Sequence, residues 1–209
     1  VERVFGVTLH TYRHPKDNRN FYAPDTTPSV DAPVALLEVS GLDNYSLPHP
    51  KSVVKPAATI SNAEPRSGSG SGGSYLGNDF RAAYVPGTPL TGTGQSVALL
   101  QFDGYYLNDI AAYLNTAGKP VSLTNILTNV AVNGGVSTPG SGNGEVCLDI
   151  EMVMSMAPGV SNIYVYEAPN PSPWEDVFNR IASDDTAHQV SCSWNGGPQI
   201  GRASCRERV

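Results

Sequence analysis

Between residues 96 and 194 the sequence alternates between segments typical of buried strands and segments typical of helices. The predicted strands are 96–102, 162–167 and 189–194, and the predicted helices are 107–117, 145–156 and 173–183. The first strand, SVALLQF, is an almost continuous apolar run, as expected of a parallel strand covered on both faces. Residues 128–143 are rich in Gly and Ser and predict a loop. The alternation therefore predicts an α/β fold, a parallel sheet with helices on both faces.

The composition restricts the partners that this chain can have. Its 209 residues are 40% hydrophobic, which is enough for a buried core, but no run of eighteen apolar residues could span a membrane. Charged residues make up only 15% of the chain, the net charge is −6, and no basic cluster lies in its body. We therefore expect neither nucleic acid nor a membrane as a partner. Few Lys and Arg residues, with 21 Gly, 17 Pro and 10 Tyr, suit a secreted protein.

A Gly- and Ser-rich segment, SGSGSGGS at residues 67–74, divides the chain. It satisfies the pattern G-x-G-x-x-G, but no strand precedes it and no apolar helix follows at once, so a dinucleotide site is not indicated. We interpret residues 61–74 as a flexible linker. Residues 1–60, with short apolar runs between Pro-rich breaks, are then part of a small α+β unit, and residues 75–198 form a second unit.

Two carboxylates stand four residues apart at the start of the helix predicted for 145–156. Glu145 and Asp149 would project from one helix face, one turn apart. Like charges so placed repel each other, whereas a catalytic site can use one carboxylate as a base and the other to orient it. Acidic residues in a first helical turn also favour the helix dipole, so the spacing alone leaves a structural role open.

The wider sequence resembles a known family. GEVCLDIE at 144–151 is followed by MAPG at 156–159 and by SCSW at 191–194. This order closely resembles the sedolisins, the serine-carboxyl peptidases, over about residues 75–198. Upstream, VSGLD at 39–43 resembles the end of the family's activation propeptide. The resemblance implies a subtilisin-like fold, a precursor form, and an endopeptidase that cleaves peptides or proteins in acid.

The resemblance also implies a Ser-Glu-Asp triad in which Glu145 is the general base and Asp149 is hydrogen-bonded behind it. A histidine base is protonated well below pH 6, whereas a glutamate, with an ordinary pKa of about 4.3, is still usable there. We expect the two carboxyls to titrate as a coupled pair. The family's nucleophile lies in a Ser-Gly-Thr-Ser-x-x-x-Pro segment, and neither it nor the oxyanion aspartate upstream of it is found before Pro198. We therefore expect a fragment without the nucleophile, inactive as it stands.

Four further residues are expected to support this site. Trp194 matches the tryptophan of the family's Ser-x-Ser-Trp strand end, although an ordinary core position is the alternative for it. Gln101 lies where the family can have a glutamate that extends the carboxylate network, and an amide there removes a charge but can still form hydrogen bonds. Ser193 and Gly196 should line the substrate cleft. The histidines are expected to be solvated or structural, which argues against a Ser-His-Asp hydrolase: His10, His14, His49 and His188.

The sequence supports few expectations about bound cofactors and about a disulfide. The resemblance implies calcium in the full-length protein, at a site near the family's C-terminus that this chain does not include, and no cofactor in the fragment. Cys147 and Cys192 fit neither a CxxC motif nor an ordinary zinc site. If the family's fold holds, they lie on neighbouring elements, and either a disulfide or two buried thiols is possible.

The two ends of the sequence are unusual. Residues 200–209 include three Arg residues, and they can be encoded by ATC GGA AGA GCG TCG TGT AGG GAA AGA GTG, which resembles sequencing-adapter DNA. We interpret residues 199–209 as an artefact of this kind, with a natural basic tail as the alternative. The chain begins at Val1 without a Met, so a signal peptide would not be visible.

Two other functions are compatible with parts of the sequence. A noncatalytic sedolisin-like binding domain would share the same motifs, and the nucleophile segment of the full-length protein separates it from an enzyme. A glycosidase could use Glu145 and Asp149, but its two carboxyls usually come from different elements on either side of a sugar. Adjacent turns of one helix suit that arrangement poorly.

Overall fold

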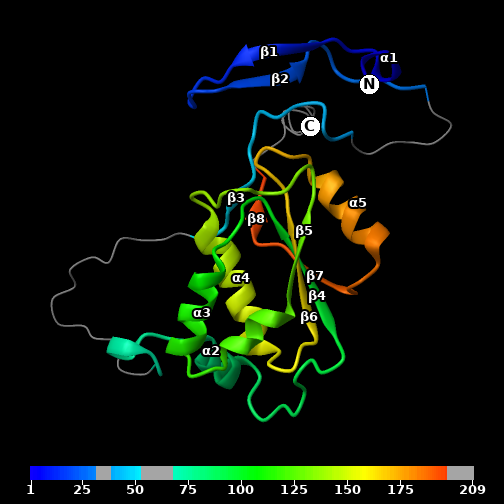
Figure 1. Ribbon diagram of the computed structural model, residues 1–209. Helices are drawn as coiled ribbons and strands as arrows, with labels where there is room; N and C mark the ends of the chain where they lie inside the picture. The colour runs from blue at the N-terminus through cyan, green and yellow to red at the C-terminus, as the bar shows by residue number, and fades with distance from the viewer. Residues whose placement is uncertain (32–38, 53–67, 197–209) are drawn as a thin grey trace, which may run out of the picture.

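The computed structural model describes residues 1–31, 39–52 and 68–196 (Figure 1). Its centre is a four-stranded sheet in the order β5-β6-β4-β7, and all neighbouring strands are parallel. The strands are β4 (Ser96–Gln101), β5 (Leu127–Ala131), β6 (Asn162–Glu167) and β7 (Gln189–Ser191). Because the strands are parallel, their carboxyl ends meet at one edge of the sheet, where active sites of such folds gather.

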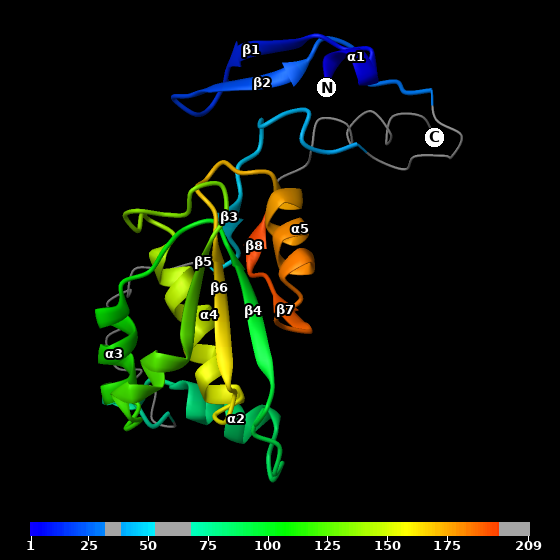
Figure 2. The same ribbon diagram turned by 45° about the vertical axis from the view of Figure 1, so that its right-hand side comes forward.

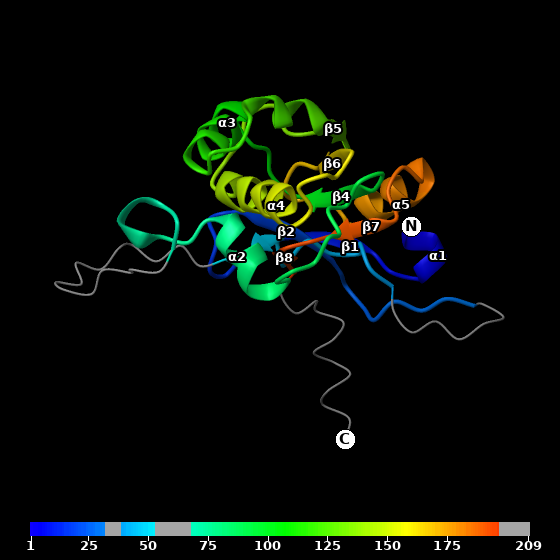
Figure 3. The same cartoon turned by 90° about the horizontal axis from the view of Figure 1, so that it is seen from below.

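Helices cover both faces of this sheet, as Figure 3 shows from below. One face carries α2 (Gly77–Tyr84), α3 (Leu107–Thr116) and α4 (Asn143–Met156), and the other carries α5 (Trp174–Asp184). A 3₁₀ helix, η2 (Val121–Ile126), connects α3 to β5. The predicted α/β architecture is confirmed, and it is that of a subtilisin-like fold.

The helices pack through residues spaced by four. In α4 the side chains of Val146, Ile150 and Met154 are all at most 1% exposed and belong to the core beside the sheet. In α5, Val177 and Ile181 are buried and belong to the core on the opposite face of the sheet. This spacing places one apolar stripe of each helix against the strands, and it leaves the neighbouring stripe of α4 to carry Glu145 and Asp149.

The N-terminal part lies beyond the carboxyl ends of the strands (Figures 1 and 2). It contains α1 (Glu2–Phe5) and an antiparallel hairpin of β1 (Leu9–Arg13) and β2 (Asn20–Pro24). Val7, Ala23 and Leu42, which are buried apolar side chains of this part, are outside the buried cluster around the sheet, which draws on described residues from 98 to 194. A short strand, β3 (His49–Pro50), continues from it and pairs with β8 (Trp194–Asn195).

Two expectations need correction. The loop predicted for 128–143 begins within a strand, β5, which lies at the sheet edge and has no fully buried residue, so its apolar signal is weak. The strand predicted for 189–194 ends at Ser191, because the chain then leaves the sheet to form β8. Within the segment interpreted as a linker, residues 68–74 form a hydrogen-bonded turn around η1 (Ser71–Gly73). Residues 61–67 and 199–209 lie outside the described residues. Within the described ranges no helix has the length and apolar composition to cross a membrane.

Candidate active site

The start of α4 is set by a carboxylate at the end of β4. Asp103 Oδ1 accepts the backbone N–H groups of Gly104 and Gly140, each at 2.8 Å, and Oδ2 accepts that of Gly142 at 2.7 Å. Gly142 is the N-cap residue of α4, and its carbonyl accepts the N–H of Glu145 at 2.9 Å. Asp103 therefore holds the loop before α4 and, through it, the first helical turn.

Glu145 and Asp149 lie one turn apart on α4, and both are buried, with 5% and 9% of their surface exposed. Burial raises the pKa of Asp149 above its ordinary value. Hydrogen bonds from Ser193 and Gln101 act in the opposite direction, and the charge of Glu145 raises the pKa further. The two carboxyls are thus close enough for one charge to affect the other.

A chain of hydrogen bonds connects Asp149 to Trp194. Ser193 Oγ donates to Asp149 Oδ1 at 2.7 Å, and Gln101 Nε2 donates to Oδ2 at 2.8 Å. Trp194 Nε1 donates to Gln101 Oε1 at 2.7 Å. The ring of Trp194 also meets Phe102 edge to face, with centroids 5.8 Å apart. Residues from β4, α4 and the β7–β8 segment therefore meet at this point.

The side-chain amide of Gln101 donates a hydrogen bond to one neighbour, Asp149, and accepts one from the other, Trp194. An indole N–H can only donate, and an ionised carboxylate can only accept, so the residue between them must accept on one side and donate on the other. A glutamine amide does both at any pH, whereas a glutamate could do so only when protonated. The network thus extends through residue 101 without a third acid.

Replacing Gln101 by Leu should destabilise the protein by about 2 kcal/mol, because Trp194 Nε1 and Asp149 Oδ2 would each lose a partner while buried. Urea unfolding of wild-type and variant chains measures this difference. The matched control is Gln189→Leu, at an exposed amide on β7, which should change stability by less than about 0.5 kcal/mol. Equal stability of the two variants would show that the buried bridge contributes nothing.

A residue that sequence reasoning missed lies against Glu145. Ser52 contacts Glu145 Oε2 through its backbone N–H, at 3.3 Å, and through its hydroxyl. The preceding residues run antiparallel to β8, with His49 opposite Asn195 and Pro50 opposite Trp194. The two residues of the Ser52 contact are 93 positions apart, so no local pattern could have predicted it.

The space beside this segment is a cavity of about 480 Å³. Its lining comes from β3, from the end of β4, from the loop before α4 and from β8, and includes Pro50, Phe102, Ser141 and Trp194. Gly196 does not line it but lines a second cavity of about 420 Å³, together with Trp174 and residues of the N-terminal part. Trp194 lines this cavity, whereas Ser193, which was expected to line the cleft, is not among its lining residues and donates its hydroxyl to Asp149.

A further carboxylate, Glu167 at the end of β6, is 7% exposed and accepts a hydrogen bond from Asn129 Nδ2 at 3.3 Å. Burial, and secondly the charge of Asp103, raise the pKa of Glu167 to about 7. Tyr105, whose hydroxyl donates to Asn129 Oδ1, completes its polar surroundings. A sequence pattern could not have indicated this, because the shift depends on tertiary burial.

Glu167 should make folding depend on pH. Since its folded pKa lies above the unfolded value near 4.5, the folded state binds more protons between these values. Its contribution is fully present below about pH 4.5 and is lost as the pH rises through about 7. Glu167→Gln should remove about 2 kcal/mol of the stability loss between pH 4 and 8. Urea unfolding at both pH values measures this, and an unchanged difference would contradict it.

Among the described residues, the cysteines and histidines form none of the hydrogen bonds that link Glu145, Asp149, Gln101, Ser193 and Trp194. Cys147 and Cys192 are free thiols, and burial raises the pKa of both, that of Cys147 to about 12. His14 is buried against Tyr45 in the N-terminal part, His10 and His188 are exposed, and His49 lies in β3 at the cleft. Among the described residues, no group of three or more His, Cys, Asp or Glu side chains that could hold a metal ion is found.

Comparison with known proteins gave one informative match. No family profile matches the chain. Kumamolisin from Bacillus sp. (strain MN-32) is 32% identical over 207 residues, which cover 95% of this chain. The chain spans only 36% of the length of kumamolisin. Taken with the order of motifs and the parallel α/β fold, this similarity shows that the chain belongs to the sedolisin-like family.

Proposed function

We propose that the longer protein containing this chain is a serine-carboxyl endopeptidase, made as a precursor, that acts in acid with Glu145 as its general base. The observation that carries this proposal is the pair of buried carboxylates on α4, one of which is fully engaged while the other faces an extended segment in the cleft. Its substrates would be peptides and proteins.

The two carboxylates have different surroundings, which supports different roles. Asp149 accepts hydrogen bonds on both oxygens, from Ser193 and Gln101, so its carboxylate is held in place. Glu145 Oε2 is contacted by Ser52 of the segment that crosses the site. Glu145 is thus the group placed to take a proton from a nucleophile, while the charge of Asp149 behind it favours the proton's transfer.

The nucleophile would come from residues outside this chain. A serine hydroxyl near Glu145 would lose its proton to the carboxylate as it attacks a peptide carbonyl. Glu145 would later return that proton to the leaving nitrogen. Secretion, and calcium bound by other parts of the longer protein, are further elements of this proposal.

Substrate would bind by adding a strand to β8. The segment Pro48–Ser52 does this already, through the antiparallel pairing of β3 with β8 and the bond from Lys51 N to Ser193 O at 2.9 Å. Main-chain pairing of this kind gives affinity without strict side-chain selection. An extended substrate segment fits the same place.

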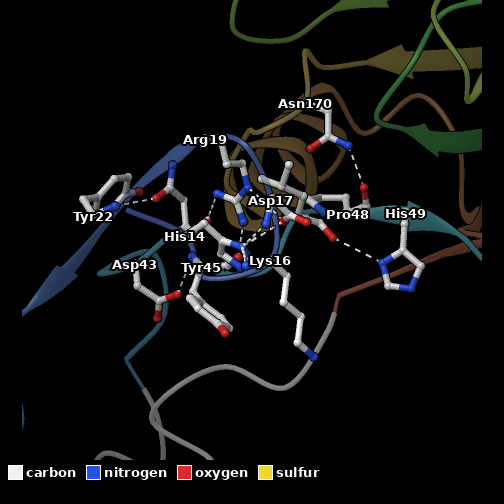
Figure 4. Close-up of polar contacts among 12 residues, drawn as sticks. His14, Lys16, Asp17, Arg19, Tyr22, Asp43, Tyr45, Pro48, His49 and Asn170 are labelled. Atoms are coloured by element: carbon white, nitrogen blue, oxygen red, sulfur yellow. Dashed lines mark hydrogen bonds and ion pairs between the residues drawn. The ribbon is translucent and has the colours of Figure 1, made fainter. Parts of the chain in front are cut away.

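Residues 1–60 would be part of the activation propeptide, and contacts from Arg19, Ser40 and Pro48 hold its described parts over the site. Asn170 Nδ2 donates to Pro48 O at 2.6 Å, as Figure 4 shows, and Ser40 contacts Glu175 of α5. Arg19 donates to the carbonyl of Asn44 at 2.8 Å, which ties the hairpin to the segment leading into the cleft. A chain held in this way excludes other substrates until it is removed. In the same proposal, residues 61–74 would be the linker that follows the propeptide, and residues 75–198 would be the N-terminal part of the peptidase domain.

Casein digestion tests the proposed function. The full-length protein should digest casein at about pH 4 and much less at pH 8, while this chain alone should digest none. Activity of the chain alone would mean that it already holds a nucleophile. A folded full-length protein without activity at any pH would instead support the noncatalytic binding domain.

A further inference from the structure

We propose that Asn170 is a substrate-positioning residue, whose side-chain amide pairs with both main-chain polar groups of one substrate residue, the residue that takes the place of Pro48. This proposal rests on the proposed function, since it treats the segment Pro48–Ser52 as a stand-in for an extended substrate. It gives the loop after β6 a role in binding that adds to the strand pairing with β8.

The main chain of this segment alternates between two directions. In antiparallel pairs a residue directs its N–H and its carbonyl to the same side, and successive residues alternate. Lys51 N donates to Ser193 O at 2.9 Å, so Lys51 is directed toward β8. Pro50, opposite Trp194, is therefore directed away from β8, and Pro48, two residues earlier, faces the same way as Pro50.

Asn170 lies on the side to which Pro48 is directed. Its Nδ2 donates to the carbonyl of Pro48 at 2.6 Å, as Figure 4 shows, and both residues line the cavity of about 480 Å³. Pro48 is buried, so this hydrogen bond is sheltered from water. The segment is thus held at two edges, by β8 at one and by Asn170 at the other.

Pro48 contacts only one end of the Asn170 amide. A side-chain amide has an N–H donor and an accepting oxygen, whereas proline has a carbonyl but no N–H. Any other residue at this place would offer its N–H to Asn170 Oδ1 beside the carbonyl that Nδ2 already contacts. The arrangement therefore favours substrates without proline at this position. Because an amide does not ionise, the contact is the same in acid and at neutral pH.

The local sequence holds Asn170 ready for this contact. Pro169 and Pro171 flank it, so φ is fixed at both neighbouring positions. A residue before proline is also confined to extended backbone, which applies to Asn170 itself. Ala168 N donates to Gln101 O at 3.0 Å and anchors the start of the loop beside the carboxylate network. Little backbone freedom is therefore lost when a substrate binds.

The test uses the mature enzyme from the full-length precursor, with three capped peptides as competitive inhibitors of casein digestion at about pH 4. LPHPK is residues 47–51, LAHPK has alanine in place of Pro48, and HPK lacks residues 47 and 48. The three peptides offer Asn170 one, two and no main-chain hydrogen bonds, respectively. Inhibition constants are measured for the wild-type enzyme and for Asn170→Ala.

Asn170→Ala should weaken inhibition by LAHPK about 25-fold, by LPHPK about fivefold and by HPK less than about twofold. Asn179→Ala, at an exposed position of α5, is the matched control and should change each constant less than about twofold. An equal loss for all three peptides would show a structural effect on the cleft, and an equal loss for LAHPK and LPHPK would show that Oδ1 accepts nothing. Either result would overturn the proposal.

Casein digestion itself separates the two possible failures. An enzyme that digests casein in acid, but whose inhibition constants do not follow the order LAHPK, LPHPK, HPK in their response to Asn170→Ala, defeats only the proposal about Asn170. A folded full-length protein that digests no casein defeats the proposed function, and this proposal with it.

Discussion

Glu145→Gln in the full-length protein should abolish both casein digestion at acid pH and self-removal of residues 1–60. The amide keeps the size of the side chain but cannot take a proton from a nucleophile, so we expect a fall in kcat/KM of about 10³-fold or more. Gel analysis of self-processing and a casein assay at pH 4 measure the two effects. The variant precursor should persist uncut after transfer to acid.

Glu151→Gln is the matched control, because Glu151 lies on the same helix and its surroundings involve Asp109, not the cleft. Its activity should stay within threefold of wild type. Full activity of Glu145→Gln, or an equal loss in both variants, would mean that the assignment of the base is wrong.

Gly142→Ala should cost about 3 kcal/mol of stability and at least tenfold in activity. A Cβ at this position would lie 2.7 Å from Trp194 Cη2 and 2.9 Å from Asp103 Oδ2, both within the buried site. The backbone of Gly142, with φ −85° and ψ −4°, is available to alanine, so the cost is steric. Because Gly142 precedes Glu145 by one turn, its displacement should also move the base.

Gly144→Ala provides the comparison, since a Cβ there meets no atom within 4 Å. It lies inside the first turn of α4, where alanine should stabilise the helix by about 0.5 kcal/mol. Thermal unfolding and casein digestion of both variants test the pair. Similar behaviour of the two would show that close packing at Gly142 does not position the site.

The parts predicted best from the sequence are the long periodic ones. The apolar run of β4 and the stripe of α4 have strong local patterns, and their boundaries differ from the predicted ones by one or two residues. The edge strand β5 was missed because most of its side chains face solvent. The end of β7 was placed too late, because β8 is formed by pairing with β3, a contact distant in sequence.

For the candidate site, the spacing of Glu145 and Asp149 predicted a shared helix face, and the structure places them on one. The spacing could not show which acid is held on both oxygens, because that depends on Gln101 and Ser193 from other parts of the chain. The approach of Ser52 to Glu145 depends on the path of the N-terminal segment across β8. Such arrangements are properties of the folded chain and leave no mark in a short stretch of sequence.

The dependence of kcat/KM on pH tests the central claim most directly, with the full-length protein after self-processing and a peptide substrate between pH 2 and 9. A carboxylate base paired with a second carboxyl predicts an optimum at about pH 3 to 5, where one of two coupled carboxyls is ionised. A rise through about pH 6.5 to a plateau above pH 7, as a histidine base produces, would contradict the account.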